Sequence, residues 1–143
     1  MNKRILLIMA FVTVFAMVIT ACQPAAAPKP AAEAGPITIG YGAPSLDAFQ
    51  TNVMMSMTNY AQQKGWQVTT SNANFDAEAQ ANEVDFWISL GVDAIVVVPI
   101  DSKAICASVT KAKEAGIPFF TIDRAPTGCE IDMTVQADNE QGG

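Results

Sequence analysis

Residues 94–98 read Ala-Ile-Val-Val-Val, an unbroken apolar run that follows the turn signal Gly91-Val92-Asp93 and ends at Pro99. A strand that is buried on one face alternates apolar and polar side chains, whereas a central strand of a parallel sheet is apolar on both faces. The run therefore predicts the central strand of a parallel sheet that helices cover on both sides.

Strand and helix signals alternate on either side of this run. Further strands are predicted at 37–41, 66–70, 119–122 and 133–137. Helices are predicted from Asp47 to Gly65, from Asp76 to Leu90 and from Asp101 or Ser102 to Ala115, and another is expected to begin at Asp138 and Asn139. Strands that helices separate imply right-handed crossovers, so the predicted fold class is α/β: a doubly wound parallel sheet with helices on both faces.

Ligands of such sheets bind beyond the carboxyl ends of the strands. This rule selects three candidate binding loops, at residues 42–49, 99–102 and 123–129. A nucleotide site is not predicted, because Gly40-Tyr41-Gly42 lacks a third glycine at the dinucleotide-binding spacing and no phosphate-binding loop motif occurs. The Gly-Tyr-Gly tripeptide is instead expected to be a turn after the first strand.

Composition excludes several classes of function. The chain has no histidine, which removes Ser-His and Cys-His catalytic pairs and histidine-ligated zinc. Its 8 Lys and Arg residues are outnumbered by 14 Asp and Glu residues, for a net charge of -6, so no nucleic-acid surface is predicted. No carboxylates have the spacing of a metal-binding loop. Neither a metal site nor a cofactor is expected.

The amino-terminal segment has the features of an export signal. Lys3 and Arg4 precede an apolar stretch at 5–19, which is short for a membrane span of about 20 residues and typical of a signal peptide. Small residues then lead to Cys22, an arrangement that resembles the lipid-attachment site of bacterial lipoproteins. An ordinary signal peptide that is cut near Ala21 is the alternative.

The chain is therefore interpreted in three parts. Residues 1–21 are expected to be a lipoprotein signal peptide, and residues 22–36 an extended tether that is rich in Ala and Pro. Residues 37–143 are expected to form the folded domain.

Four blocks of this domain, and the residues that close it, resemble a known family. The blocks are residues 37–41, 91–99, 115–118 and 121–124, and residues 136–143 continue the pattern. In this order they resemble the type 1 periplasmic sugar-binding proteins, most closely the ribose-binding cluster of bacterial ABC importers. The resemblance implies an exported solute-binding lipoprotein, anchored to the cell membrane by lipid, that holds a monosaccharide in a two-lobed cleft and delivers it to ABC permease subunits. Family members have a second lobe that this sequence does not contain, so residues 37–143 are expected to be an incomplete first lobe.

The resemblance implies sugar-binding roles for Asp123 and Arg124, and Phe49, Asp47 and Gln50, at or just after the candidate loop at 42–49, are further candidates. Asp123 would accept hydrogen bonds from sugar hydroxyls and Arg124 would donate to hydroxyls or to the ring oxygen; a solvated turn with an incidental charge pair is the alternative. Phe49 would stack on the C–H face of the sugar or else face the core. Asp47 would bind hydroxyls or only cap its helix, and Gln50 would contact the sugar or be an exposed residue of the first helical turn.

One departure from the family bears on the ligand. Many relatives carry Pro and two aromatic residues after the first strand, whereas this chain reads Ala48-Phe49-Gln50. One of the two stacking rings is therefore missing, which leaves the identity of the sugar open and puts ribose in question.

The two cysteines of the folded domain are expected to pair. With Cys22 assigned to the lipid, Cys106 and Cys129 remain as an even pair in an oxidising compartment, where such pairs usually bond. Both would lie at one edge of the sheet if the strands at 94–98 and 119–122 are neighbours. Two separate buried thiols are the alternative.

Two other functions compete with that of a transport protein. An exported sensor domain would pass the same ligand-induced closure to a receptor, and a small exported enzyme would use Asp123 as base or nucleophile. The enzyme hypothesis has no histidine, nucleophile elbow or cofactor motif to support it. A binding protein without catalytic residues is therefore predicted.

Overall fold

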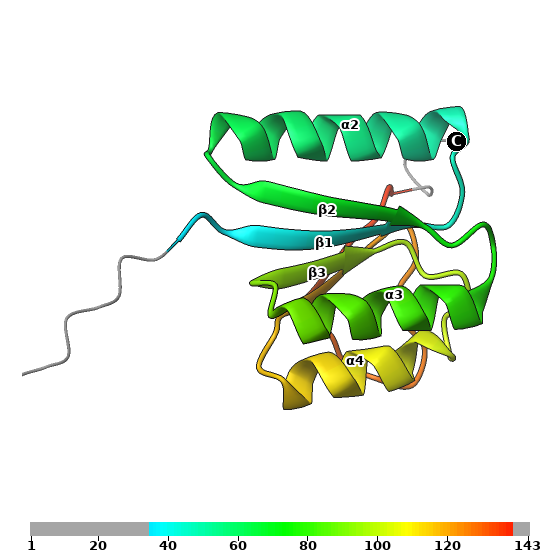
Figure 1. Ribbon diagram of the computed structural model, residues 1–143. Coiled ribbons are helices and arrows are strands. Elements are labelled where there is room, and N and C mark those ends of the chain that lie inside the picture. Colours follow the sequence, from blue (N-terminus) through cyan, green and yellow to red (C-terminus); the bar gives the residue numbers. More distant parts are fainter. Residues whose placement is uncertain (1–34, 139–143) are drawn as a thin grey trace, which may run out of the picture. The chain divides into compact units, whose positions relative to one another are not determined.

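The computed structural model describes residues 35–138, and within them the chain forms a five-stranded parallel sheet (Figure 1). The central run predicted from the sequence supplies a strand that pairs with neighbours on both sides, so the central position of that strand is confirmed. In the spatial order β2-β1-β3-β4-β5, the strands are β1 (Thr38–Ala43), β2 (Gln67–Asn72), β3 (Ala94–Val97), β4 (Phe119–Ile122) and β5 (Met133–Val135).

Three helices of the described residues cover the two faces of this sheet (Figure 1). Helix α2 (Ala48–Gln63) lies on one face, and α3 (Ala77–Leu90) and α4 (Ile105–Glu114) lie side by side on the other. The predicted α/β class, with helices on both faces of a parallel sheet, is confirmed.

Local signals set the ends of two helices where the sequence predicts them. Asp47 caps α2 by accepting the backbone N–H of Gln50 at 2.9 Å, and Asp76 caps α3 by accepting two backbone N–H groups of its first turn. Gly91 ends α3 at φ 66, a left-handed conformation that costs glycine little. These caps fix where the chain leaves and re-enters the sheet.

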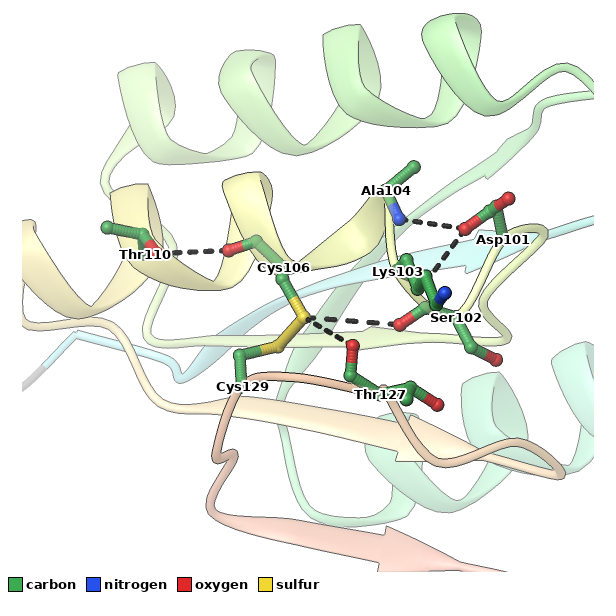
Figure 2. The surroundings of a disulfide bond; sticks show 8 residues. All are labelled: Asp101, Ser102, Lys103, Ala104, Cys106, Thr110, Thr127 and Cys129. Carbon is green, nitrogen blue, oxygen red and sulfur yellow. Dashed lines mark hydrogen bonds between the residues drawn. A yellow bond between two sulfur atoms is a disulfide. The ribbon is translucent and has the colours of Figure 1, made fainter.

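The start of α4 differs from the prediction. The helix begins at Ile105 rather than at Asp101 or Ser102. Asp101 still acts as a cap, because its Oδ1 accepts the backbone N–H groups of Lys103 and Ala104 at 2.7 and 2.8 Å (Figure 2). It caps a separate turn at 101–104 that precedes the regular helix.

The last crossover of the described chain also differs from the earlier ones. An irregular loop at 123–132, without a helix, connects β4 to β5, and β5 ends at Val135 rather than at 137. The expected signal peptide at 1–21, Cys22, most of the tether at 22–36 and the helix expected at Asn139 lie outside the described residues.

The main core lies between the sheet and the pair α3 and α4. Trp87 of α3 is fully buried and packs directly on β1. A Cβ atom on Gly40 would lie 2.4 Å from Cδ2 of Trp87, and one on Gly42 would lie 3.1 Å from its Cη2. The expected turn at Gly40-Tyr41-Gly42 is therefore wrong: both glycines lie inside β1, on the face that the indole covers. The other buried members of this core are Val84, Val92, Ile95, Val97, Ile105, Val109, Ala112, Ile117 and Phe119.

We predict that Gly40→Ala destabilises the domain. The added methyl group would overlap the Trp87 ring, which has no space to move within the core, and such overpacking costs about 1–3 kcal/mol of unfolding free energy. Gly35→Ala is the control, since no atom lies within 4 Å of the Cβ that it would add. Equal urea midpoints for the two variants would show that the indole does not rest on β1 as described.

Candidate ligand-binding site

The turn after β4 carries the two charged residues that the sequence singles out. Asp123 has φ 69, a left-handed conformation that is uncommon outside glycine but more accessible to Asp than to most residues. Its backbone N–H donates to the carbonyl oxygen of Val135 at 2.8 Å, and the N–H of Arg124 donates to the carbonyl of Ile122 at 2.8 Å. These bonds hold a sharp bend in the chain at the carboxyl edge of the sheet.

The side chain of Arg124 reaches from the end of β4 to the loop that follows β3. Its Nη1 donates to the carbonyl oxygen of Pro99 at 3.2 Å and, at a longer 3.5 Å, to that of Ile100. Its Nε lies 3.7 Å from Oδ2 of Asp123, and both side chains are 47% exposed. The pair therefore presents carboxylate oxygens and guanidinium N–H groups to solvent from a defined position.

Gln80 holds the loop on which Arg124 rests. The Gln80 side chain is 1% exposed; its Nε2 donates to the carbonyl of Val98 at 2.9 Å, and its Oε1 accepts the backbone N–H of Ile100 at 3.1 Å. A buried amide with both ends satisfied fixes backbone position strongly. Sequence reasoning missed this residue. Its signal is a polar side chain at position 80 in the apolar stripe that continues at Val84 and Trp87.

The loop between β1 and α2 contributes an acidic cap. Oδ2 of Asp47 accepts the Ser45 hydroxyl at 2.6 Å, and Oδ1 accepts the Gln50 backbone N–H. These two hydrogen bonds, the Ser45 one foremost, hold the pKa of Asp47 below its usual value. The structure therefore gives Asp47 the capping role, and a contact with sugar stays a prediction.

Phe49 and Gln50 are neighbours in sequence with opposite environments. Phe49 is 57% exposed, so the alternative in which it faces the core is wrong, and its ring is available to a ligand. Gln50 is only 5% exposed, so the expectation of an exposed first-turn residue is also wrong. Its Oε1 accepts the hydroxyl of buried Tyr41 at 3.4 Å. The pKa of Tyr41 is raised, mainly by burial and further by the charge of Asp47.

The structure thus brings together part of the expected site. β1 and β3 are adjacent strands, so the loop that leads into Phe49 lies next to the loop that Arg124 reaches. Asp123 lies one strand further along the same edge. Gln50 points into the protein instead of toward this edge.

A disulfide bond braces the loop that carries the charged pair (Figure 2). Cys106, in the first turn of α4, is joined to Cys129 of the 123–132 loop, with a Cα–Cα distance of 5.6 Å. The strands that precede them, β3 and β4, are neighbours, as the expected pairing requires. Nearby, the backbone N–H of Thr127 donates to the carbonyl of Ser102 at 2.7 Å. The loop after β4 is therefore joined to the start of α4 by a covalent bond and to the loop after β3 by a hydrogen bond.

We predict that removing this bond destabilises the domain without unfolding the sheet. The double variant Cys106→Ser, Cys129→Ser opens a loop whose ends are 23 residues apart, and the loop-entropy model gives a loss of about 3 kcal/mol. The free energy of unfolding in urea measures the change. Thiol alkylation and mass spectrometry of unreduced, exported protein provide the check: two free thiols in the unmodified chain would reject the bond.

Two further findings concern metal binding and membrane-spanning helices in the described residues. Among residues 35–138, no group of three or more Cys, Asp or Glu side chains gathers in a way that could hold a metal ion. In the same range no helix has the length and hydropathy of a membrane span.

Comparison with known proteins relates the whole described sheet to one family. Residues 39–143 match the family described as the periplasmic binding protein domain. The chain is 33% identical over 107 residues to the ribose import binding protein RbsB of Bacillus subtilis. The matched region covers 74% of this chain and 35% of that protein. It is 32% identical over 105 residues to the xylitol-binding protein of Mycolicibacterium smegmatis, and that match covers 73% of this chain and 30% of the other protein.

Solved structures agree with this relationship. A solute-binding protein of an ABC transporter from Mycobacterium smegmatis, with bound glycerol, superposes with a TM-score of 0.69 at 29% identity and covers 74% of this chain and 37% of that one. A solute-binding protein from Bacillus halodurans with bound myo-inositol has a TM-score of 0.60 at 32% identity. That match covers 66% of this chain and 33% of the other. The chain thus spans about a third of the length of these relatives, all of which are binding proteins rather than enzymes.

Proposed function

This chain belongs to the periplasmic binding protein family, and we propose that it forms the first lobe of an exported solute-binding protein that captures a monosaccharide for an ABC importer. The observation that carries the proposal is the arrangement of Asp123 and Arg124, half-exposed at the carboxyl edge of the sheet and held on the loop after β3. Relatives named for ribose, xylitol and xylose support a small polyhydroxylated ligand.

The chemistry of these side chains suits a sugar. The carboxylate of Asp123 can accept hydrogen bonds from two hydroxyls, and the guanidinium of Arg124 offers donors in a fixed planar fork. The exposed ring of Phe49 offers an apolar surface to the C–H bonds of the sugar. Asp47 would add a carboxylate oxygen only where its bonds to Ser45 and Gln50 leave a lone pair free.

Residues 37–143 are proposed as one lobe of a two-lobed cleft. The relatives are about three times as long as the matched region, and a second lobe would supply the opposite wall. Binding would then close the lobes about a hinge, and the closed form would be the one that a permease accepts. In this scheme the protein transfers its ligand without chemistry.

We predict that Asp123→Asn weakens sugar binding in the full-length protein. Asn tolerates the left-handed backbone at this position but removes the charge, and losing a hydrogen bond to a charged group costs about 1.5–3 kcal/mol, or roughly ten- to a hundredfold in affinity. Calorimetry with ribose, xylose, xylitol and myo-inositol measures the change for whichever of these binds the unmodified protein.

The matched control is Asp85→Asn. Asp85 lies on α3, where it forms an exposed ion pair of 2.7 Å with Lys111 of α4, away from the carboxyl edge. Such pairs contribute about 0–1 kcal/mol to stability, and we expect the affinity to be unchanged. If the Asp123→Asn variant binds sugar as tightly as the control variant, the sugar site does not lie at this edge of the sheet.

Export and lipid anchoring are proposed from the amino-terminal sequence, and the Cys106–Cys129 disulfide is consistent with an oxidising compartment. We predict that Cys22→Ser blocks processing or releases the protein from the membrane fraction, because serine lacks the thiol to which the lipid would be attached. Fractionation followed by mass measurement of the amino terminus tests this. Unchanged membrane association together with an unchanged mature amino terminus would contradict the lipid anchor.

A further inference from the structure

Phe75 combines an exposed ring with a left-handed backbone, and the packing of the fold requires neither. It lies in the loop between β2 and α3 and is 64% exposed, more than any other large apolar side chain of the described residues. Its φ is 61, and that of the preceding Asn74 is 50. A bulky residue in the left-handed region is a conformational outlier, and such outliers concentrate at functional sites.

Backbone hydrogen bonds hold Phe75 in this conformation. Its N–H donates to the carbonyl oxygen of Pro44 at 2.7 Å, and the N–H of Ala73 donates to the carbonyl of Ala43 at 3.1 Å. The side chain of Asn72 accepts the N–H of Asn74 at 3.1 Å. The β2–α3 loop is thus tied to the β1–α2 loop, and glycine or asparagine would serve this turn with less strain than phenylalanine.

The location of the ring relates it to the candidate site. β2 is the neighbour of β1 in the parallel sheet, so its loop leaves the same carboxyl edge as the loop that leads to Phe49. Ala48 provides no ring beside Phe49. Asp123 follows β4, on the other side of β1 and β3. With about 4.8 Å between strands, the ends of β2 and β4 are separated by three spacings, or roughly 14 Å.

From this placement we propose that Phe75 is a second aromatic contact for the bound carbohydrate, at the end of the ligand away from Asp123 and Arg124. The inference rests on the proposed function and refines it. Asp123 and Arg124 would bind the hydroxyl-rich side of the ligand, and Phe75 would contact a C–H-rich edge on the opposite side. Phe75 would therefore favour ligands with such an apolar edge over ligands with hydroxyls all round.

The test uses the full-length protein, three new variants and the Asp123→Asn variant described above, each titrated with ribose, xylose, xylitol and myo-inositol. Phe75→Asn keeps a left-handed backbone and removes the ring, so the Kd of the tightest-binding compound should rise about five- to thirtyfold, while Tm stays level or rises. Phe75→Tyr retains the ring and should bind within about threefold of the unmodified protein. Phe86→Ala is the control, because Phe86 is also an exposed phenylalanine but lies on α3.

The outcomes distinguish a failure of the inference about Phe75 from a failure of the proposed sugar-binding function. If Phe75→Asn binds like Phe86→Ala while Asp123→Asn loses affinity, the ring makes no contact and the inference is overturned, although the sugar site stands. If Phe75→Asn and Phe75→Tyr lose affinity equally, the loop and not the ring is responsible, and the inference also fails. If the unmodified protein binds none of the four compounds, the proposed function and the inference fall together.

Discussion

The contact between the indole of Trp87 and the bare backbone of β1 sets the position of the candidate site. Because Gly40 and Gly42 have no side chains, α3 can lie close to the sheet. Gln80 precedes Trp87 by seven residues, two helical turns on the same face, so this approach also delivers the Gln80 amide to the end of β3. The amide fixes the loop at 98–100, and Arg124 rests on the carbonyls of that loop. Packing in the core is thereby linked to the orientation of a charged group at the surface.

Much of the fold could be predicted from local sequence, because its decisive signals are local. The apolar run at 94–98, the cap residues Asp47 and Asp76, and Gly91 each act over a few residues, and each has its predicted role in the structure. The errors occurred where tertiary contacts override the local signal. Gly40-Tyr41-Gly42 resembles a turn, but the glycines make room for a ring 47 and 45 residues away, and no spacing rule reports that.

The site was predictable in outline only. The strand-end rule and the Asp-Arg pair locate Asp123 and Arg124, but the reach of Arg124 to Pro99 depends on β3 and β4 being neighbours. Gln50 was placed wrongly because polarity suggests exposure, whereas the hydroxyl of Tyr41 gives this amide a buried partner. Phe75 was not recognised, since its exposure and its left-handed backbone become visible only when the loop after β2 meets the loop after β1.

The bond between Cys106 and Cys129 also makes a closed covalent ring of the chain that it spans. That ring contains the rest of α4, all of β4 and the bend at Asp123 and Arg124. It also contains the exposed stretch around Thr127 and Gly128, the kind of loop tip at which proteases cut. A single cleavage there would leave both pieces covalently joined and β4 still paired within the sheet. The charged edge would thus survive a single nick in this loop.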